Sequence, residues 1–163
     1  EMTMTTASAK SQQVTVSKKA KQALAPLLTA YFEMKQALSK DDFENAKKVG
    51  VVLNSVLEGV NMSLFKGSSH NVWMGYSSAL KSNVQHIEHM TSIVELRLKF
   101  INISQDIIGI VESFEPMSEP LYIQHCPMAN SNKGADWLSQ KSDIVNPYFG
   151  SAMLTCGEVT KEL

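Results

Sequence analysis

Cysteines, unbalanced charge and long apolar runs are all scarce in this sequence. Its 163 residues include two cysteines, and 15 basic against 16 acidic side chains give a net charge of −1. A nearly neutral chain lacks the basic surface of a nucleic-acid-binding protein, so we expect no nucleic acid partner. Near the end of the last predicted helix the longest apolar stretch, residues 107–111, contains Gly109, whereas crossing a bilayer takes about 20 apolar residues. We therefore expect no transmembrane segment.

In other respects the sequence has the composition of an ordinary globular protein, with 44% hydrophobic and 19% charged residues. The first residues are rich in Thr, Ser, Ala and Gln and show no apolar periodicity, so residues 1–14 are predicted to be a disordered leader. A chain of this length suits one core. We expect residues 15–163 to form a single domain with two parts, a helical bundle over residues 15–115 and an irregular tail over residues 116–163.

Apolar residues recur at helical spacing in four successive segments of the bundle region. The first contains Pro26, which predicts a kink, and the third follows an N-cap signal at Gly67. Ser92 and Glu95 match the capping box that begins many helices. The fold class predicted is therefore mainly all-α, an antiparallel four-helix bundle whose helices cover residues 15–38, 41–64, 67–90 and 92–114.

The helical period ends at Pro116 and Pro120. Short apolar runs and turn signals follow, and strands are predicted at Leu121 to Ile123 and at Glu158–Val159. We expect the tail to form an irregular segment with a short β-hairpin, packed on the bundle.

No recognised arrangement of catalytic residues occurs in the chain. A di-iron bundle needs Glu-x-x-His on two helices, and none of the four histidines follows a glutamate at that spacing. An acid/base pair, a nucleophile with its base and a phosphate-cradling loop are also absent at recognisable spacing. We therefore expect that the protein is not an enzyme.

Soft metal donors are concentrated in the tail. Cys126 and Met128 lie two residues apart, Met153 and Cys156 three apart, and His125 precedes the first cysteine. Thiolate and thioether sulfur prefer Cu(I) or Ag(I) to hard cations, and zinc fits less well because structural zinc takes four ligands. These five residues are the predicted metal ligands, for Cu(I) or Ag(I).

The same cysteines allow a different interpretation. Two cysteines thirty positions apart could close the tail as a Cys126–Cys156 disulfide, which a chain-entropy treatment values at roughly 3.5 to 4 kcal/mol. The protein would then be a non-catalytic protein-interaction domain. From the residues alone both alternatives remain open.

The tail also resembles a known family in four sequence words. Residues 122–128 read YIQHCPM, and GADWLS, NPYFG and MLTCG follow at residues 134–139, 146–150 and 153–157. These words, with Arg97, Phe100 and Ser104 of the fourth helix, resemble an uncharacterised bacterial family common in Bacteroidetes. That family occurs as exported proteins and fused to periplasmic adaptor subunits of copper/silver efflux pumps.

The resemblance implies a setting and a partner. It implies an exported, periplasmic or otherwise extracytoplasmic protein that works with a periplasmic adaptor or another envelope protein of metal efflux. The Cys-Pro-Met stretch is similar to a heavy-metal-binding module in which His and Pro follow, but here Ala129 and Asn130 stand at those places, and His125 is the candidate replacement. The extracytoplasmic setting and the sulfur chemistry together favour metal binding. Trp137, Tyr148 and Phe149 are expected to be apolar anchors that hold the tail on the bundle.

Overall fold

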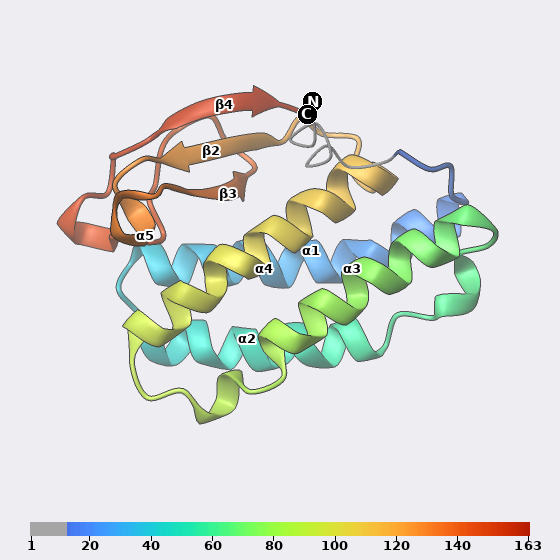
Figure 1. Cartoon of the computed structure of the whole chain (residues 1–163), viewed down its shortest axis with the longest axis horizontal. Coiled ribbons are helices and arrows are strands. Elements are labelled where there is room, and N and C mark those ends of the chain that lie inside the picture. The colour runs from blue at the N-terminus through green and yellow to red at the C-terminus, as the bar shows by residue number, and fades with distance from the viewer. Residues whose placement is uncertain (1–12) are drawn as a thin grey trace, which may run out of the picture.

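Four long helices make up most of the computed structural model, which describes residues 13–163 (Figure 1). Their positions agree with the four predicted segments, and the prediction of a mainly helical protein is confirmed. Two short 3-10 helices, η2 (Met62–Leu64) and η3 (Ile87–His89), follow the second and third long helices where longer helices were predicted. The long helices are α1 (Lys18–Ser39), α2 (Phe43–Glu58), α3 (Ser68–Val84) and α4 (Ile93–Phe114).

Side-chain caps explain where these helices begin. Ser17, Asp42 and Ser92 accept a hydrogen bond from a backbone N–H of the first turn of α1, α2 and α4 respectively. The predicted box at the start of α4 forms with one difference, because Glu95 accepts from the N–H of Thr91, one residue before the cap. α1 continues through Pro26.

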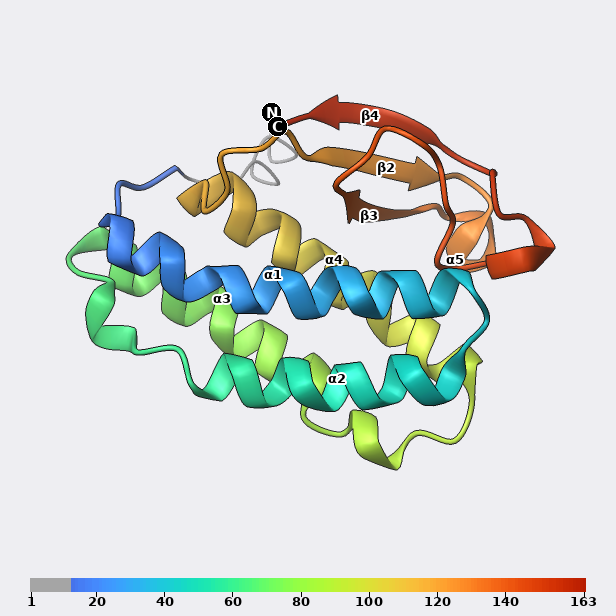
Figure 2. The same cartoon turned by 180° about the vertical axis from the view of Figure 1, so that it is seen from behind.

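The helices pack in neighbouring pairs and carry the sheet along one side. α1 contacts α2 and α4, and α3 contacts α2 and α4. Figures 1 and 2 show the sheet lying over α1 and α4, on the side away from α2. In the described part of the chain, no helix is both long and apolar enough to cross a membrane.

The tail forms a three-stranded antiparallel sheet in the order β3-β2-β4, rather than the short hairpin that was predicted. Its strands are β2 (Tyr122–Cys126), β3 (Ala135–Ser139) and β4 (Glu158–Glu162). β3 was not predicted, because it is only five residues long and its side chains do not alternate between buried and exposed. β3 packs on α4, and all five residues of β4 are exposed.

The turn between β2 and β3 is left-handed. It is labelled α5 (Ala129–Asn132) in Figure 1, but its last three residues have positive φ angles of 57°, 55° and 67°. Asparagine tolerates this region better than most residues, and Gly134 follows at φ +88°. The turn lies in the part of the tail where the sequence shows turn signals.

The predicted disordered leader falls mainly on residues 1–12, which lie outside the described residues. Its last two positions are described and contact α4. The Val14 N–H donates to the Ser113 carbonyl at 3.0 Å, and the Gln13 amide donates to the Glu115 carboxylate at 3.0 Å.

Candidate dithiol site

The two cysteines meet although thirty residues separate them. The Sγ atoms of Cys126 and Cys156 are 3.1 Å apart, and both are free thiols. This separation is longer than the roughly 2.05 Å of a disulfide bond, and it places the two thiols within hydrogen-bond distance of each other. Cys126 is fully buried at the end of the central strand, whereas Cys156 is partly exposed in the turn before β4.

The hydrogen bond with Cys126 raises the pKa of Cys156 above its usual value, and burial adds to the effect. Sulfur binds a metal or attacks a disulfide as the thiolate. The pair therefore has to release a proton before it does either.

Asn146 positions the turn that carries Cys156. Its buried side chain donates to the Cys156 carbonyl at 2.8 Å, and its Oδ1 accepts from the N–H groups of Tyr148 and Phe149 at 2.8 and 3.1 Å. Its own N–H donates to the Leu154 carbonyl at 2.7 Å. The Asn146 side chain thus forms hydrogen bonds with both ends of the loop that precedes β4.

Tyr148 then ties this loop to the sheet and to α4. Its hydroxyl lies 2.5 Å from the Asp136 carbonyl and 3.4 Å from the Ser104 hydroxyl. Its ring contacts Phe100 and Trp137, each at a centroid distance of 5.9 Å. Burial raises the pKa of Tyr148 well above its ordinary value, which keeps the hydroxyl protonated as a donor.

Arg97 attaches the same loop to the helices. Its guanidinium donates to the Pro147 carbonyl at 2.8 Å, to the Leu38 carbonyl at 2.7 Å and to the Asp41 carboxylate at 2.9 Å. The hydrogen bond from Ser151 and the one from Arg97 hold the pKa of Asp41 below its usual value. Arg97, Phe100 and Ser104, the residues noted in the fourth helix, therefore all contact the tail or its supports.

His125 does not join the cysteines. Successive side chains of a strand point to opposite faces, so His125 and Cys126 lie on opposite faces of β2. The His125 Nδ1 pairs with the carboxylate of Asp136 at 2.7 Å, directly across from it on β3.

The two methionines differ in their relation to the thiols. Met153 belongs to the same turn as Cys156, because its carbonyl accepts the Cys156 N–H at 3.1 Å. Met128 lies two residues beyond Cys126 and is 47% exposed. Within residues 13–163 no three His, Cys, Asp or Glu side chains are grouped so that they could hold a metal ion. A metal at this site would therefore depend on sulfur.

Sequence reasoning missed Gln124, which lies on the same face of β2 as Cys126. Its buried amide nitrogen contacts the carbonyls of Lys141, Ser142 and Asp143 at 3.0 to 3.2 Å. These contacts hold the loop after β3 against the sheet. A glutamine in the middle of the short strand Tyr122–Cys126 was the available signal.

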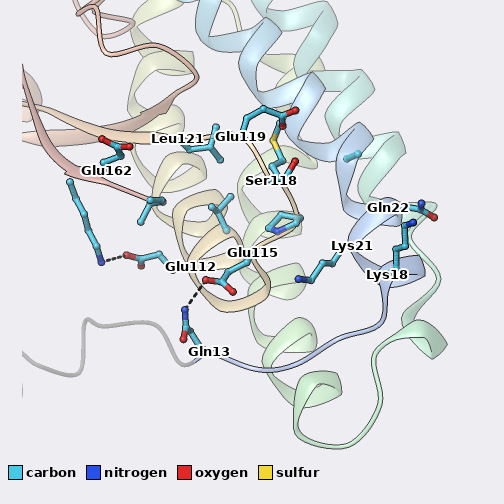
Figure 3. A pocket seen from close by; sticks show the side chains of 16 residues that line it. Gln13, Lys18, Lys21, Gln22, Glu112, Glu115, Ser118, Glu119, Leu121 and Glu162 are labelled. Carbon is cyan, nitrogen blue, oxygen red and sulfur yellow. Dashed lines mark hydrogen bonds and ion pairs between the residues drawn. The ribbon is translucent and has the colours of Figure 1, made fainter.

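A groove lies at the opposite end of β4, and its lining contains no cysteine (Figure 3). It has a volume of about 1040 Å³ and is lined by Lys18 and Lys21 of α1 and by Glu112 and Glu115 at the end of α4. Glu115 of its wall accepts from Gln13, and Lys161 pairs with Glu112 at 3.3 Å. Because both lysines and glutamates line this groove, its charge does not favour any one class of ligand.

The fold and site define a mainly helical protein whose C-terminal antiparallel sheet carries a dithiol. A family described as "Protein of unknown function (DUF3347)" matches residues 27–119, which is more than half of the chain, and the protein belongs to this family. The match runs from within α1 to the link before β2, so it does not include the dithiol. No curated protein and no solved structure matches the chain.

Proposed function

We propose that this protein binds a soft monovalent ion, Cu(I) or Ag(I), between Cys126 and Cys156, as a step in heavy-metal efflux or homeostasis outside the cytoplasm. The observation that carries the proposal is the convergence of the only two cysteines of the chain, with their sulfurs 3.1 Å apart. Such an encounter between positions thirty residues apart requires the whole tail to be folded around it.

The donor set favours a low-coordinate soft ion. Two thiolates match the preference of Cu(I) and Ag(I) for sulfur, and Met153 in the same turn as Cys156 is a candidate thioether donor. Met128, which is 47% exposed two residues beyond the end of β2, is a second candidate thioether donor. Structural zinc takes four N, S or O ligands, and no third His, Cys, Asp or Glu of the described residues lies with the pair. His125 is not a ligand in this proposal.

The surroundings suit capture and transfer of an ion rather than catalysis. Cys126 is held in the central strand, while Cys156 lies in a partly exposed turn through which an ion can enter and leave. We take the four long helices to be an antiparallel bundle, which supports the loop before this turn through Arg97 and Ser104. The partner proposed is a periplasmic adaptor or another envelope protein of a metal efflux system.

The test is an anaerobic competition titration of the reduced protein with Cu(I) against a chromophoric chelator. One ion should bind per chain, and Cys126→Ser or Cys156→Ser should each weaken binding at least about tenfold, equivalent to about 1.4 kcal/mol. Met153→Leu should have a smaller effect, and His125→Ala should have none.

Matched controls separate ligand loss from damage to the fold. Met62→Leu removes a thioether that is 52% exposed in η2 and should leave the affinity unchanged. Circular dichroism should show that the cysteine variants are folded, with Cys126→Ala as a second variant of the buried position. Unchanged affinity in both cysteine variants would refute the proposed site.

The interaction-domain alternative has one observation in its favour. Val94 and Leu98, one turn apart on α4, are 65% and 55% exposed. Two large apolar side chains on one exposed helix face are suited to contact with another protein. If the titration shows no Cu(I) binding, this alternative becomes the better account of the fold.

A further inference from the structure

The two thiols of the pair differ sharply in access. The Cys126 side chain is fully buried at the end of β2, and Cys156 is partly exposed in the turn that precedes β4. A disulfide reagent has to reach the sulfur that attacks it. Only Cys156 is accessible for that first step.

The second sulfur is already in place for a second step. The Cys126 Sγ lies 3.1 Å from the Cys156 Sγ, so an approach of about 1 Å would complete a bond of disulfide length. Cys156 lies in a turn, where its N–H donates to the Met153 carbonyl and its carbonyl accepts from the Asn146 side chain. A turn permits a shift of that size more readily than a central strand does.

We propose that Cys156 is the site at which small disulfides modify this protein, and that Cys126 resolves the mixed disulfide into an intramolecular Cys126–Cys156 bond. This inference goes beyond the proposed metal binding and does not rest on it. It assigns the two thiols separate roles, whereas metal binding uses them alike.

The exchange balances with a small disulfide such as oxidised glutathione as the oxidant. The Cys156 thiol loses its proton to solvent, and the thiolate attacks one sulfur of the reagent, which breaks the reagent's S–S bond and releases one thiolate. The Cys126 thiol then also loses its proton to solvent, and its thiolate attacks the Cys156 sulfur and expels the second thiolate. Each released thiolate takes a proton from solvent and becomes a thiol. The protein is oxidised by two electrons and the reagent is reduced to two thiols.

Oxidation would also withdraw both thiolates from a metal ion, since neither sulfur of a disulfide is a thiolate ligand. The proposed metal site would then be open only while the pair is reduced.

The test follows the reaction of reduced, metal-free protein with oxidised glutathione by intact mass, with a chelator present throughout. The chain contains no other cysteine, so every adduct is assigned. The wild type should lose two hydrogen atoms without accumulating a glutathione adduct. Cys126→Ser should accumulate a stable adduct at Cys156, and Cys156→Ser should react at least about tenfold more slowly because its remaining thiol is buried.

Two controls keep the result interpretable. In denaturant the two variants should react at equal rates, which shows that the fold causes the difference. If Cys126→Ser does not fold, limited alkylation of the reduced wild type followed by peptide mapping should label Cys156 first. Equal rates for the folded variants, preferential alkylation of Cys126, or a lasting adduct on the wild type would each overturn the assignment. Because no metal is present, these outcomes are independent of the Cu(I) titration.

Discussion

Lys35 is a charged residue whose buried surroundings destabilise its charged form. Its side chain lies inside the protein at 8% exposure, with the hydroxyl of Ser139 at 3.5 Å and no carboxylate in ion-pair contact within residues 13–163. Burial, with a smaller contribution from the charge of Lys141, lowers the pKa of Lys35 from 10.5 to about 8. The folded protein therefore carries this ammonium at neutral pH at a cost in stability.

Lys35→Met should stabilise the protein by up to about 3 kcal/mol at pH 7, the value of a pKa difference of this size. Because the pKa is lower in the folded state, the wild type binds fewer protons than its unfolded chain between pH 8 and 10.5, and its stability should rise with pH across that window. The variant should lack this rise. Denaturant unfolding at pH 7 and pH 10 measures both effects, with the exposed Lys48→Met as control. A variant no more stable than the wild type would show that the ammonium is well solvated.

At the scale of elements, the joint between the tail and the helices depends on Gly150 at the start of η4 (Gly150–Ala152). Its φ is +56°, and an added Cβ would lie 1.9 Å from the Asp41 Oδ1 and 2.6 Å from the Arg97 guanidinium. The carboxylate–guanidinium pair that anchors the loop thus leaves no room for a side chain.

Gly150→Ala should therefore destabilise the protein by about 1 to 3 kcal/mol, because it combines a left-handed φ with displacement of the anchor. Gly75→Ala is the matched control, since nothing lies within 4 Å of a Cβ at that position inside α3. It should be neutral or stabilising by up to about 1 kcal/mol, through better helix propensity. Thermal unfolding of both variants checks this, and equal effects would contradict the account of the joint.

The helices were predictable from the sequence because their signals are local. Ser92 with Glu95, and the apolar spacing that follows, placed the start of α4 within one residue. The sheet was only partly predictable, since β3 depends on pairing with β2 and on packing against α4. Such contacts between distant residues leave little trace in a five-residue stretch.

The candidate site was likewise only partly predictable from the sequence. Residue chemistry marked Cys126 and Cys156, and the structure brings them together. It also separates His125 from them, a consequence of strand alternation that could be deduced only once residues 122–126 were known to form a strand. Asn146 and Gln124 were not predicted as supports because their roles are hydrogen bonds to a loop whose path the sequence does not reveal.

For the whole molecule, the helices and the tail form one support for the dithiol. The family match covers residues 27–119, which contain the long helices from within α1 onward, while both cysteines lie beyond it. The contacts of Arg97 and Ser104 with the loop at residues 147–148 join these two parts. Arg97 and Ser104 of α4, which lie inside the region that the family matches, thus help to position a candidate site that lies outside that region.

X-ray absorption at the copper edge of the Cu(I)-loaded protein tests the central claim most directly. The account predicts a first shell made of sulfur alone, from the two thiolates with methionine beside them, and no imidazole signal because His125 faces the other side of β2. His125→Ala should leave the spectrum unchanged, and Cys156→Ser should reduce the sulfur contribution. A first shell of nitrogen or oxygen, or a spectrum indifferent to the loss of Cys156, would contradict a dithiolate site.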